Sequence, residues 1–400
     1  MSYTPSAEIL QRYADILIKF ALGWWTWIKP GQKVLLEVPE SAKPLLVHLQ
    51  RSVLQAWWFP IIDLLPEGIM RDFFMDASDE QISYVPLNVW MAKIWEIDHR
   101  VRIISEQDKH ELKGIDSRKL MQRVASRKPI MTAMHEKENR WEFFWTLGLY
   151  GTESMASEAQ MTLEEYRQEI INACFLDFEN PIEKRQEVFD HIETTKSKLN
   201  ALSIEKVHVL WEDVDLHVKI WANRQWLWWS WRNIPSFELF TSPDWRGTNG
   251  RIRFSEPLYQ YGAFIKWIEL HFENGIITKA STKENEQMLL DMIAVEHANK
   301  VWEFSLTDRR TSRITKFMAE TLYDENVWWP YGNTHIAIWS AYKDALRTDP
   351  SKPSKEDREN RWFNDSAVHT DIVSTANRTV TATLTDGSEL IIYKDGEFVL

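Results

Sequence analysis

Hydrophobic positions in the first half of the chain alternate between helical and strand-like spacing. Apolar residues recur every three or four positions over 6–22 and 41–55, which predicts two amphipathic helices. Short, nearly unbroken apolar runs predict three buried strands, at 33–38, 60–65 and 101–105. Strands that alternate with helices are typical of an open, mostly parallel sheet. We therefore expect an α/β domain with a mostly parallel sheet in the N-terminal part.

The pattern changes after a long, charged helical region at 162–202. This region begins at Thr162-Leu163-Glu164-Glu165, a sequence that favours a capped helix start. Beyond it, apolar and polar residues alternate with period two, which predicts strands with one buried face. The predicted strands include 207–209, 214–220, 250–254 and 265–272.

Two further elements complete the prediction for the second half. Residues 283–300 have helical spacing, and a final hairpin from residue 379 turns at Asp386-Gly387. We therefore expect an α+β C-terminal domain rich in antiparallel strands. Because 400 residues exceed one ordinary hydrophobic core, we expect two domains, 1–185 and 186–400.

Composition narrows the class of protein. The chain is 44% hydrophobic and 26% charged with a net charge of -12, and it has no long basic stripe, so we expect no nucleic-acid partner. Its single cysteine, Cys174, excludes a disulfide or a cysteine-based zinc site within one chain. No apolar run approaches the roughly 18 residues that a membrane span needs, and residues 1–20 lack a signal-peptide pattern. These features predict a cytoplasmic protein without a membrane partner.

The residues that could bind a metal ion are concentrated in the second half of the chain. His369 and Asp371 are two residues apart in a predicted strand, so they share one face, and both can ligate a divalent cation. The alternative is a solvated strand face with an incidental pair. Glu238, Glu303 and His335 are, taken singly, compatible with surface or loop residues. Spacing alone therefore indicates only a His/carboxylate site.

Several motifs, in the same order along almost the whole chain, carry a family resemblance. They lie at 13–15, 38–42, 149–153, 232–243, 303, 313–326, 334–337, 364–366 and 369–371. In these stretches the chain resembles the thermophilic metallo-aminopeptidases of the aminopeptidase T and aminopeptidase S type. The resemblance implies removal of N-terminal residues from peptides that have a free N-terminus, and a homodimer.

The resemblance also implies a site with two divalent metal ions around one activated water. Its mixed oxygen and nitrogen ligands suit zinc, cobalt or manganese, and suit magnesium less well. Glu303 would move a proton from the water to the leaving amine, and Tyr342 would donate a hydrogen bond to the tetrahedral oxyanion. The implied metal ligands are Glu238, Glu303, Glu325, His335, His369 and Asp371.

Tryptophan is unusually frequent in this chain and glycine is rare. Trp occurs 22 times and Gly 13 times, which puts glycine at about 3% against a usual share of about 7%. Many of the Trp residues stand where a turn favours glycine, as in 57–60, 227–231 and 328–331.

At most of these positions the family pattern carries glycine; the exceptions are Trp145, Trp226 and Trp245. We hypothesise that the gene uses UGA for glycine and that the printed sequence was translated with UGA as tryptophan. If the chain is made as written, Trp302 beside Glu303 predicts a misfolded or blocked site with little activity. The alternative is a genuinely Trp-rich protein, either a non-catalytic module whose aromatic surface binds peptide or sugar, or an inactive relative. Mass spectrometry of the native peptide that covers 328 and 329 separates these readings.

Overall fold

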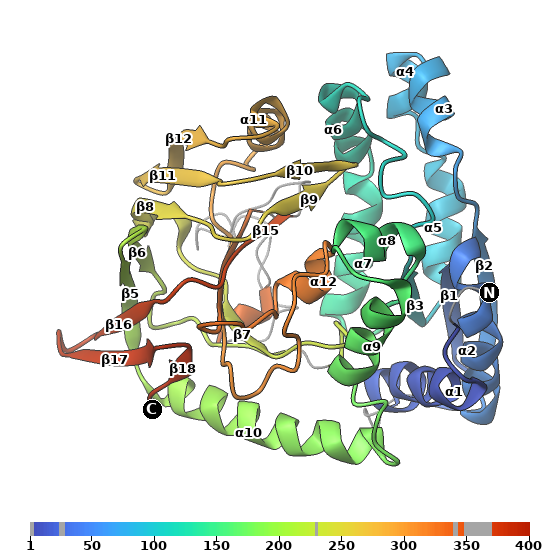
Figure 1. Ribbon diagram of the computed structural model, residues 1–400, viewed down its shortest axis with the longest axis horizontal. Helices are drawn as coiled ribbons and strands as arrows, with labels where there is room; N and C mark the ends of the chain where they lie inside the picture. Colours follow the sequence, from blue (N-terminus) through green and yellow to red (C-terminus); the bar gives the residue numbers. More distant parts are fainter. Residues whose placement is uncertain (1–3, 24–28, 229–230, 339–342, 348–369) are drawn as a thin grey trace.

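The computed structural model describes residues 4–23, 29–228, 231–338, 343–347 and 370–400. Figure 1 shows a smaller parallel sheet with its helices on one side of the molecule and a larger set of antiparallel strands on the other. This arrangement confirms the expected fold class of an α/β N-terminal part and an α+β C-terminal part. Among the described residues, the structure contains no helix with the length and apolar character needed to cross a membrane.

The N-terminal sheet has four parallel strands in the order β2-β1-β3-β4. β1 lies between two neighbours and is buried along almost its whole length, whereas β2 is at an edge and alternates between exposed and partly buried residues. The three strands expected here are confirmed, and β4 is an addition. The strands are β1 (Lys33–Pro39), β2 (Phe59–Leu65), β3 (His99–Ile104) and β4 (Phe144–Leu149).

Helices surround this sheet. The predicted helix at 6–22 is an α-helix followed by a π-helical stretch. The predicted capping box is present, because Thr162 Oγ1 accepts a hydrogen bond from the Glu165 amide at 3.2 Å and the Glu165 carboxylate accepts one from the Thr162 amide at 2.9 Å. The helical segments are α1 (Ala7–Asp15), η1 (Ile16–Leu22), η2 (Glu40–Ala42), α2 (Lys43–Gln55), α3 (Met70–Asp76), α4 (Asp79–Ser83), α5 (Leu87–Glu96), α6 (Ser117–Ser126), α7 (Lys128–Asn139), α8 (Glu153–Glu158) and α9 (Leu163–Ala173).

The helical region predicted at 162–202 is two helices rather than one. α9 ends before Phe175, whose φ of 59° turns the chain, and the 21-residue helix α10 (Pro181–Ala201) begins with Pro181 in its first turn. In Figure 1, α10 runs along the lower edge of the molecule beneath the C-terminal strands. The boundary expected at 185/186 falls inside α10, and the division into two domains stays a prediction.

The described residues of the C-terminal part form three antiparallel sheets. Eight strands form the largest, in the order β12-β11-β8-β6-β5-β16-β17-β18, four form a sheet in the order β15-β14-β13-β7, and β10 pairs with β9. The strands are β5 (Ile204–Trp211), β6 (Val214–Lys219), β7 (Glu238–Thr241), β8 (Asn249–Arg253), β9 (Leu258–Gln260), β10 (Ala263–Ile265), β11 (Glu269–Glu273), β12 (Ile276–Ser281), β13 (Glu303–Thr307), β14 (Asn333–Ile338), β15 (Thr370–Ser374), β16 (Thr379–Leu384), β17 (Glu389–Lys394) and β18 (Glu397–Phe398).

Two predicted C-terminal elements differ from the structure. The strand expected at 265–272 is divided between β10 and β11, because Trp267 between them has a left-handed φ of 61°. The helix expected at 283–300 is the shorter α11 (Glu286–Ala294), since the chain becomes extended at Val295 and left-handed at His297. The remaining short helices are η3 (Trp245–Gly247), α12 (Thr321–Asp324) and η4 (Lys343–Ala345).

Backbone contacts join the two parts beside the four-stranded antiparallel sheet. The Leu147 amide of β4 donates to the Arg232 carbonyl at 2.7 Å, and the Ile234 amide donates to the Leu147 carbonyl at 3.0 Å. The Tyr166 hydroxyl of α9 donates to the Met318 carbonyl at 3.0 Å. The N-terminal sheet thus fixes the segment that leads into β7.

Among the residues that the structure describes, four tryptophans have left-handed backbone conformations. They are Trp57, Trp141, Trp221 and Trp267, with φ values of 61°, 59°, 71° and 61°. A bulky residue is strained there, while glycine adopts this region freely. This conformation is the one that the glycine hypothesis predicts for turn positions, so the backbone supports that hypothesis at these four residues.

Candidate metal centre

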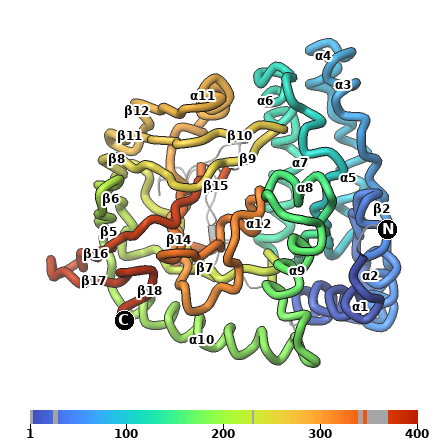
Figure 2. Tube along the Cα trace, in the orientation of Figure 1, coloured from blue at the N-terminus to red at the C-terminus, as the bar shows by residue number. Residues whose placement is uncertain are grey.

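The four-stranded antiparallel sheet carries most of the predicted ligands on one face. Residues paired across antiparallel strands share a face, and residues two apart along a strand do so as well. Glu303 pairs with Ala337, and Ala337 pairs with Asp371 on the next strand. Ser305 pairs with His335, which places His335 on the same face as Glu303. Figure 2 shows β7, β14 and β15 close together at the centre of the molecule beside α12.

Glu238 joins the same face from the other edge of the sheet. It pairs with Thr307, which is two residues beyond Ser305 on β13. Ser305 therefore stands between Glu238, Glu303 and His335, and its small side chain leaves room above the sheet for these longer ones. The short side chain of Ala337 does the same between Glu303 and Asp371.

Three of the predicted ligands converge. His335 Nε2 lies 3.0 Å from Glu238 Oε2 and 3.4 Å from Glu303 Oε1, and one ligand atom from each residue lies within 4.8 Å of the others. All three side chains are buried. Ser305 Oγ donates a hydrogen bond to Glu238 Oε2 at 2.7 Å and fixes that carboxylate.

Glu325 approaches this group from the end of α12. It is buried, and its Oε1 accepts a hydrogen bond from Asn233 Nδ2 at 3.1 Å. Its neighbour Asn326 accepts a hydrogen bond from the Phe237 amide at 2.6 Å, immediately before Glu238. These contacts tie the Glu325 loop to the start of β7, although Glu325 is not one of the three residues whose ligand atoms converge most closely.

Burial dominates the electrostatics of the site. Desolvation raises the pKa of the Glu303 carboxyl to about 8; the hydrogen bond from His335 opposes the rise and the charge of Glu238 adds to it. Desolvation and the charge of Glu238 also hold the pKa of Glu325 well above its usual range. Burial would lower the pKa of His335, but the charge of Glu238 and hydrogen bonds to both glutamates raise it well above its ordinary value.

This arrangement fits a divalent cation. Among the described residues, His335 is the only basic side chain within ion-pair distance of Glu238 or Glu303. Buried carboxylates are unfavourable unless positive charge compensates them, and a bound metal ion supplies that charge. In the described part of the chain, Nδ1 of His335 is buried and has no hydrogen-bond partner, and Nε2 is the ring nitrogen that faces the two glutamates. Carboxylate oxygen and imidazole nitrogen are common zinc, cobalt and manganese ligands.

Of the three remaining predicted site residues, the structure describes only Asp371. Asp371 is buried on β15, on the same face as Glu303 and two strands away. His369 and Tyr342 lie outside the described residues. Trp302 donates its amide to the Ala337 carbonyl at 3.0 Å, and its side chain is only 1% exposed beside Glu303. The prediction that it blocks the site remains a prediction.

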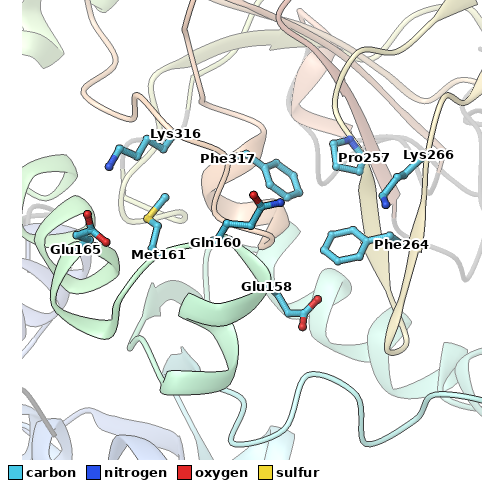
Figure 3. Close-up of a pocket in the computed structure, with 10 residues that line it drawn as sticks. Glu158, Gln160, Met161, Glu165, Pro257, Phe264, Lys266, Lys316 and Phe317 are labelled. Atoms are coloured by element: carbon cyan, nitrogen blue, oxygen red, sulfur yellow. The ribbon is translucent and has the colours of Figure 1, made fainter.

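A separate cavity of about 520 Å³ lies between the two parts of the molecule. Gln160 and Met161, in the turn between α8 and α9, line it together with Phe264, Lys266 and Phe317, as Figure 3 shows. None of the six predicted metal ligands lines this cavity within the described part of the chain. Its mixed apolar and charged lining does not extend the metal centre.

A family model described as thermophilic metalloprotease (M29) matches residues 6–398. The chain belongs to this family. As a member of this metalloprotease family it is a hydrolase of the peptidase class, which confirms the family resemblance and the enzyme class predicted from the sequence. Family membership also implies a divalent metal, for which the converging glutamates and histidine are suitable ligands.

Relatives of this metalloprotease match it end to end. Aminopeptidase PepS from Streptococcus thermophilus is 22% identical over 98% of both chains, and aminopeptidase T from Thermus thermophilus is 23% identical over 98% of both. The solved structure titled wild-type AmpT from Thermus thermophilus superposes with a TM-score of 0.82 at 19% identity, covering 98% of this chain and 99% of that one. That structural likeness confirms the fold.

Sequence reasoning missed the residues that support the ligands. Ser305 is two residues after Glu303 in a strand, so period-two spacing was a signal that it shares the site face. Asn233 and Asn326 lie in the motifs that carry the resemblance, but only the fold shows that they hold Glu325 and the start of β7.

Proposed function

We propose that this chain is a metal-dependent aminopeptidase that removes N-terminal residues from peptides at a two-metal site. The observation that carries the proposal is the convergence of Glu238, Glu303 and His335 in a buried site of a metalloprotease-family chain. The full proposed ligand set is Glu238, Glu303, Glu325, His335, His369 and Asp371. The proposed ions are zinc, cobalt or manganese, with magnesium less suitable.

The chemistry that divalent ions supply in such a site is activation of a water molecule and polarisation of the scissile carbonyl. Glu303 is proposed to accept the proton of the attacking water and deliver it to the leaving amine. Tyr342 is proposed to donate a hydrogen bond to the oxyanion of the tetrahedral intermediate.

The buried acidic face also favours a substrate with a free N-terminus. The α-amine of a peptide is a good hydrogen-bond donor, and Glu325 and Asp371 add buried acidic side chains whose oxygens can accept hydrogen bonds in the same region. An internal peptide bond offers no such group. This hydrogen-bonding preference is consistent with cleavage from the N-terminus.

The site must also be supported by its surroundings. Ser305 is proposed to hold Glu238, while Asn233 holds Glu325. Fixed carboxylates reduce the reorganisation needed when metal and substrate bind. A cytoplasmic setting and a homodimer are further parts of the proposal.

Hydrolysis of an aminoacyl chromogenic substrate tests this function. With native protein, translated by its own genetic code, we expect cleavage that is lost on chelation, restored by added zinc, cobalt or manganese, and absent with the N-acetylated form of the same substrate. Equal cleavage of the acetylated form would contradict the aminopeptidase assignment. Chelator-insensitive cleavage, or no cleavage by metal-loaded protein, would instead favour a non-catalytic binding protein or inactive relative with exposed Trp side chains such as Trp95 and Trp329.

A further inference from the structure

A second group of potential metal ligands lies on the exposed face of the eight-stranded sheet. His208 on β5 and His217 on β6 are direct cross-strand partners, and Asp215 is two residues before His217 on the same face. We propose that His208, Asp215 and His217 bind a divalent transition-metal ion of the zinc, nickel or copper type. This site belongs to a different sheet from Glu238 and Glu303.

The three side chains are already close. The imidazole rings of His208 and His217 stack with centroids 4.1 Å apart and an interplanar angle of 14°. His208 Nε2 lies 2.8 Å from Asp215 Oδ1. One ligand atom from each residue lies within 4.8 Å of the other two. Three donors of these types match a zinc or copper site that keeps one or more positions for water.

The backbone fixes this arrangement. Val207 and Val209 on β5 are buried, as are Leu216 and Val218 on β6, so period-two alternation directs His208 outward. A register slip would bury the polar side chains and expose the apolar ones, so the cross-strand histidine pair is strongly specified.

The exposed side chains need only small movements to share one ion. Zinc–nitrogen bonds of about 2.0–2.1 Å in tetrahedral geometry place two ligand nitrogens about 3.3 Å apart. Asp215 has a side chain that is 61% exposed and His208 one that is 31% exposed, so both have room to rotate. Arg251, the partner of Asp215 on β8, directs its guanidinium to the Glu212 carbonyl at 3.4 Å.

β11, in the same sheet but separated from β6 by β8, offers a matched control. His271 Nε2 on β11 lies 2.8 Å from Glu269 Oε1, so it forms the same kind of histidine–carboxylate contact. Among the described residues, this pair does not belong to a group of three side chains whose ligand atoms converge. The difference between the two places is the second histidine, which the proposed site has and the control lacks.

Metal counting on chelator-stripped and reloaded protein tests the proposal. We expect a variant with both His208→Gln and His217→Gln to bind one nickel or zinc ion per chain fewer than the wild type, with unchanged cleavage of the aminoacyl substrate. His271→Gln should bind as many ions as the wild type. An unchanged metal count in the double variant, or an equal loss in His271→Gln, would overturn the proposal.

Paramagnetic resonance of bound copper gives a second, independent measurement. The wild type should show nitrogen hyperfine coupling from two imidazoles at a copper signal that disappears in the double variant and persists in His271→Gln. Asp215→Asn keeps both imidazoles and should retain that coupling with weaker copper affinity. Persistence of the same signal in the double variant would show that copper binds elsewhere.

Discussion

Two groups of histidine and carboxylate side chains each bring three ligand atoms within 4.8 Å of one another, yet one is buried and the other is largely exposed. In the buried group, desolvation raises the pKa of Glu303 to about 8. In the exposed group, partial burial and then the charge of His208 lower the pKa of His217, and water solvates Asp215. The two groups therefore share the spacing of their ligand atoms but differ in burial and in the direction of their side-chain pKa shifts.

Burial determines how strongly each group depends on a cation. Burying a charged carboxylate costs free energy unless an opposite charge compensates it. The buried group is therefore strongly stabilised by a metal ion. The exposed group is already solvated and gains less. We infer that a metal at the buried site contributes to both folding and catalysis, while a metal at the exposed site is dispensable for both.

Metal removal should reveal the largest contrast. At a free metal concentration about 1,000 times the dissociation constant, binding stabilises the native state by about 4 kcal/mol. We expect chelation to lower the free energy of unfolding by about that amount in the wild type, measured by denaturant titration with and without chelator. The variant with His208→Gln and His217→Gln should lose almost the same amount. A loss that vanishes in this variant would assign the stabilising ion to the exposed site.

Removing the buried imidazole should have the next largest effect. Changes to residues that only support a ligand cost about 10–100-fold in affinity or activity, so loss of a ligand should cost at least about 100-fold. We expect His335→Ala to reduce kcat/KM on an aminoacyl substrate by that factor and to lower the metal content. His271→Ala, which removes a half-exposed histidine, is the control and should be unaffected.

A smaller effect is expected from the hydroxyl that holds Glu238. Ser305→Ala removes the 2.7 Å hydrogen bond to the Glu238 carboxylate, and we expect about tenfold weaker metal binding by calorimetry with the fold retained. Thr334→Val removes a buried hydroxyl from the opposite face of the same sheet and should leave metal affinity unchanged. Equal effects of the two variants would show that Ser305 acts through general packing alone.

The contrast between buried and exposed positions extends to tryptophan, where the smallest effect is expected. Trp57 is 79% exposed and has a left-handed φ of 61°, so its side chain gains little from packing while its backbone is strained. We expect Trp57→Gly to raise the free energy of unfolding by about 1 kcal/mol. Trp57→Ala keeps the strain of a non-glycine residue and should stay near the wild type. A destabilised glycine variant would count against glycine as the natural residue.

The sequence predicted which helices and strands are present better than it predicted where they begin and end. Continuous apolar runs identified β1, and the Thr162 capping signature identified the start of α9. The strand expected at 265–272 is interrupted because Trp267 has hydrophobic character that fits a strand but a backbone conformation that ends one. Side-chain hydrophobicity says nothing about φ, so periodicity alone does not find such breaks.

The candidate site depended on information that local patterns do not contain. Glu238, Glu303 and His335 lie on three strands far apart in sequence, and only the pairing of β7, β13 and β14 places them on one face. Family resemblance named them as ligands, and the register explains how they meet. The supporting role of Ser305 follows from that register, because it stands opposite His335.

Anomalous diffraction from crystals of zinc- or manganese-loaded protein shows where the metal ions bind. We expect an ion at about 2.0–2.2 Å from ligand atoms of Glu238, Glu303 and His335, with a second ion beside it. Catalytically active crystals in which the metal lies only elsewhere, with these three side chains bound to no ion, would contradict this expectation.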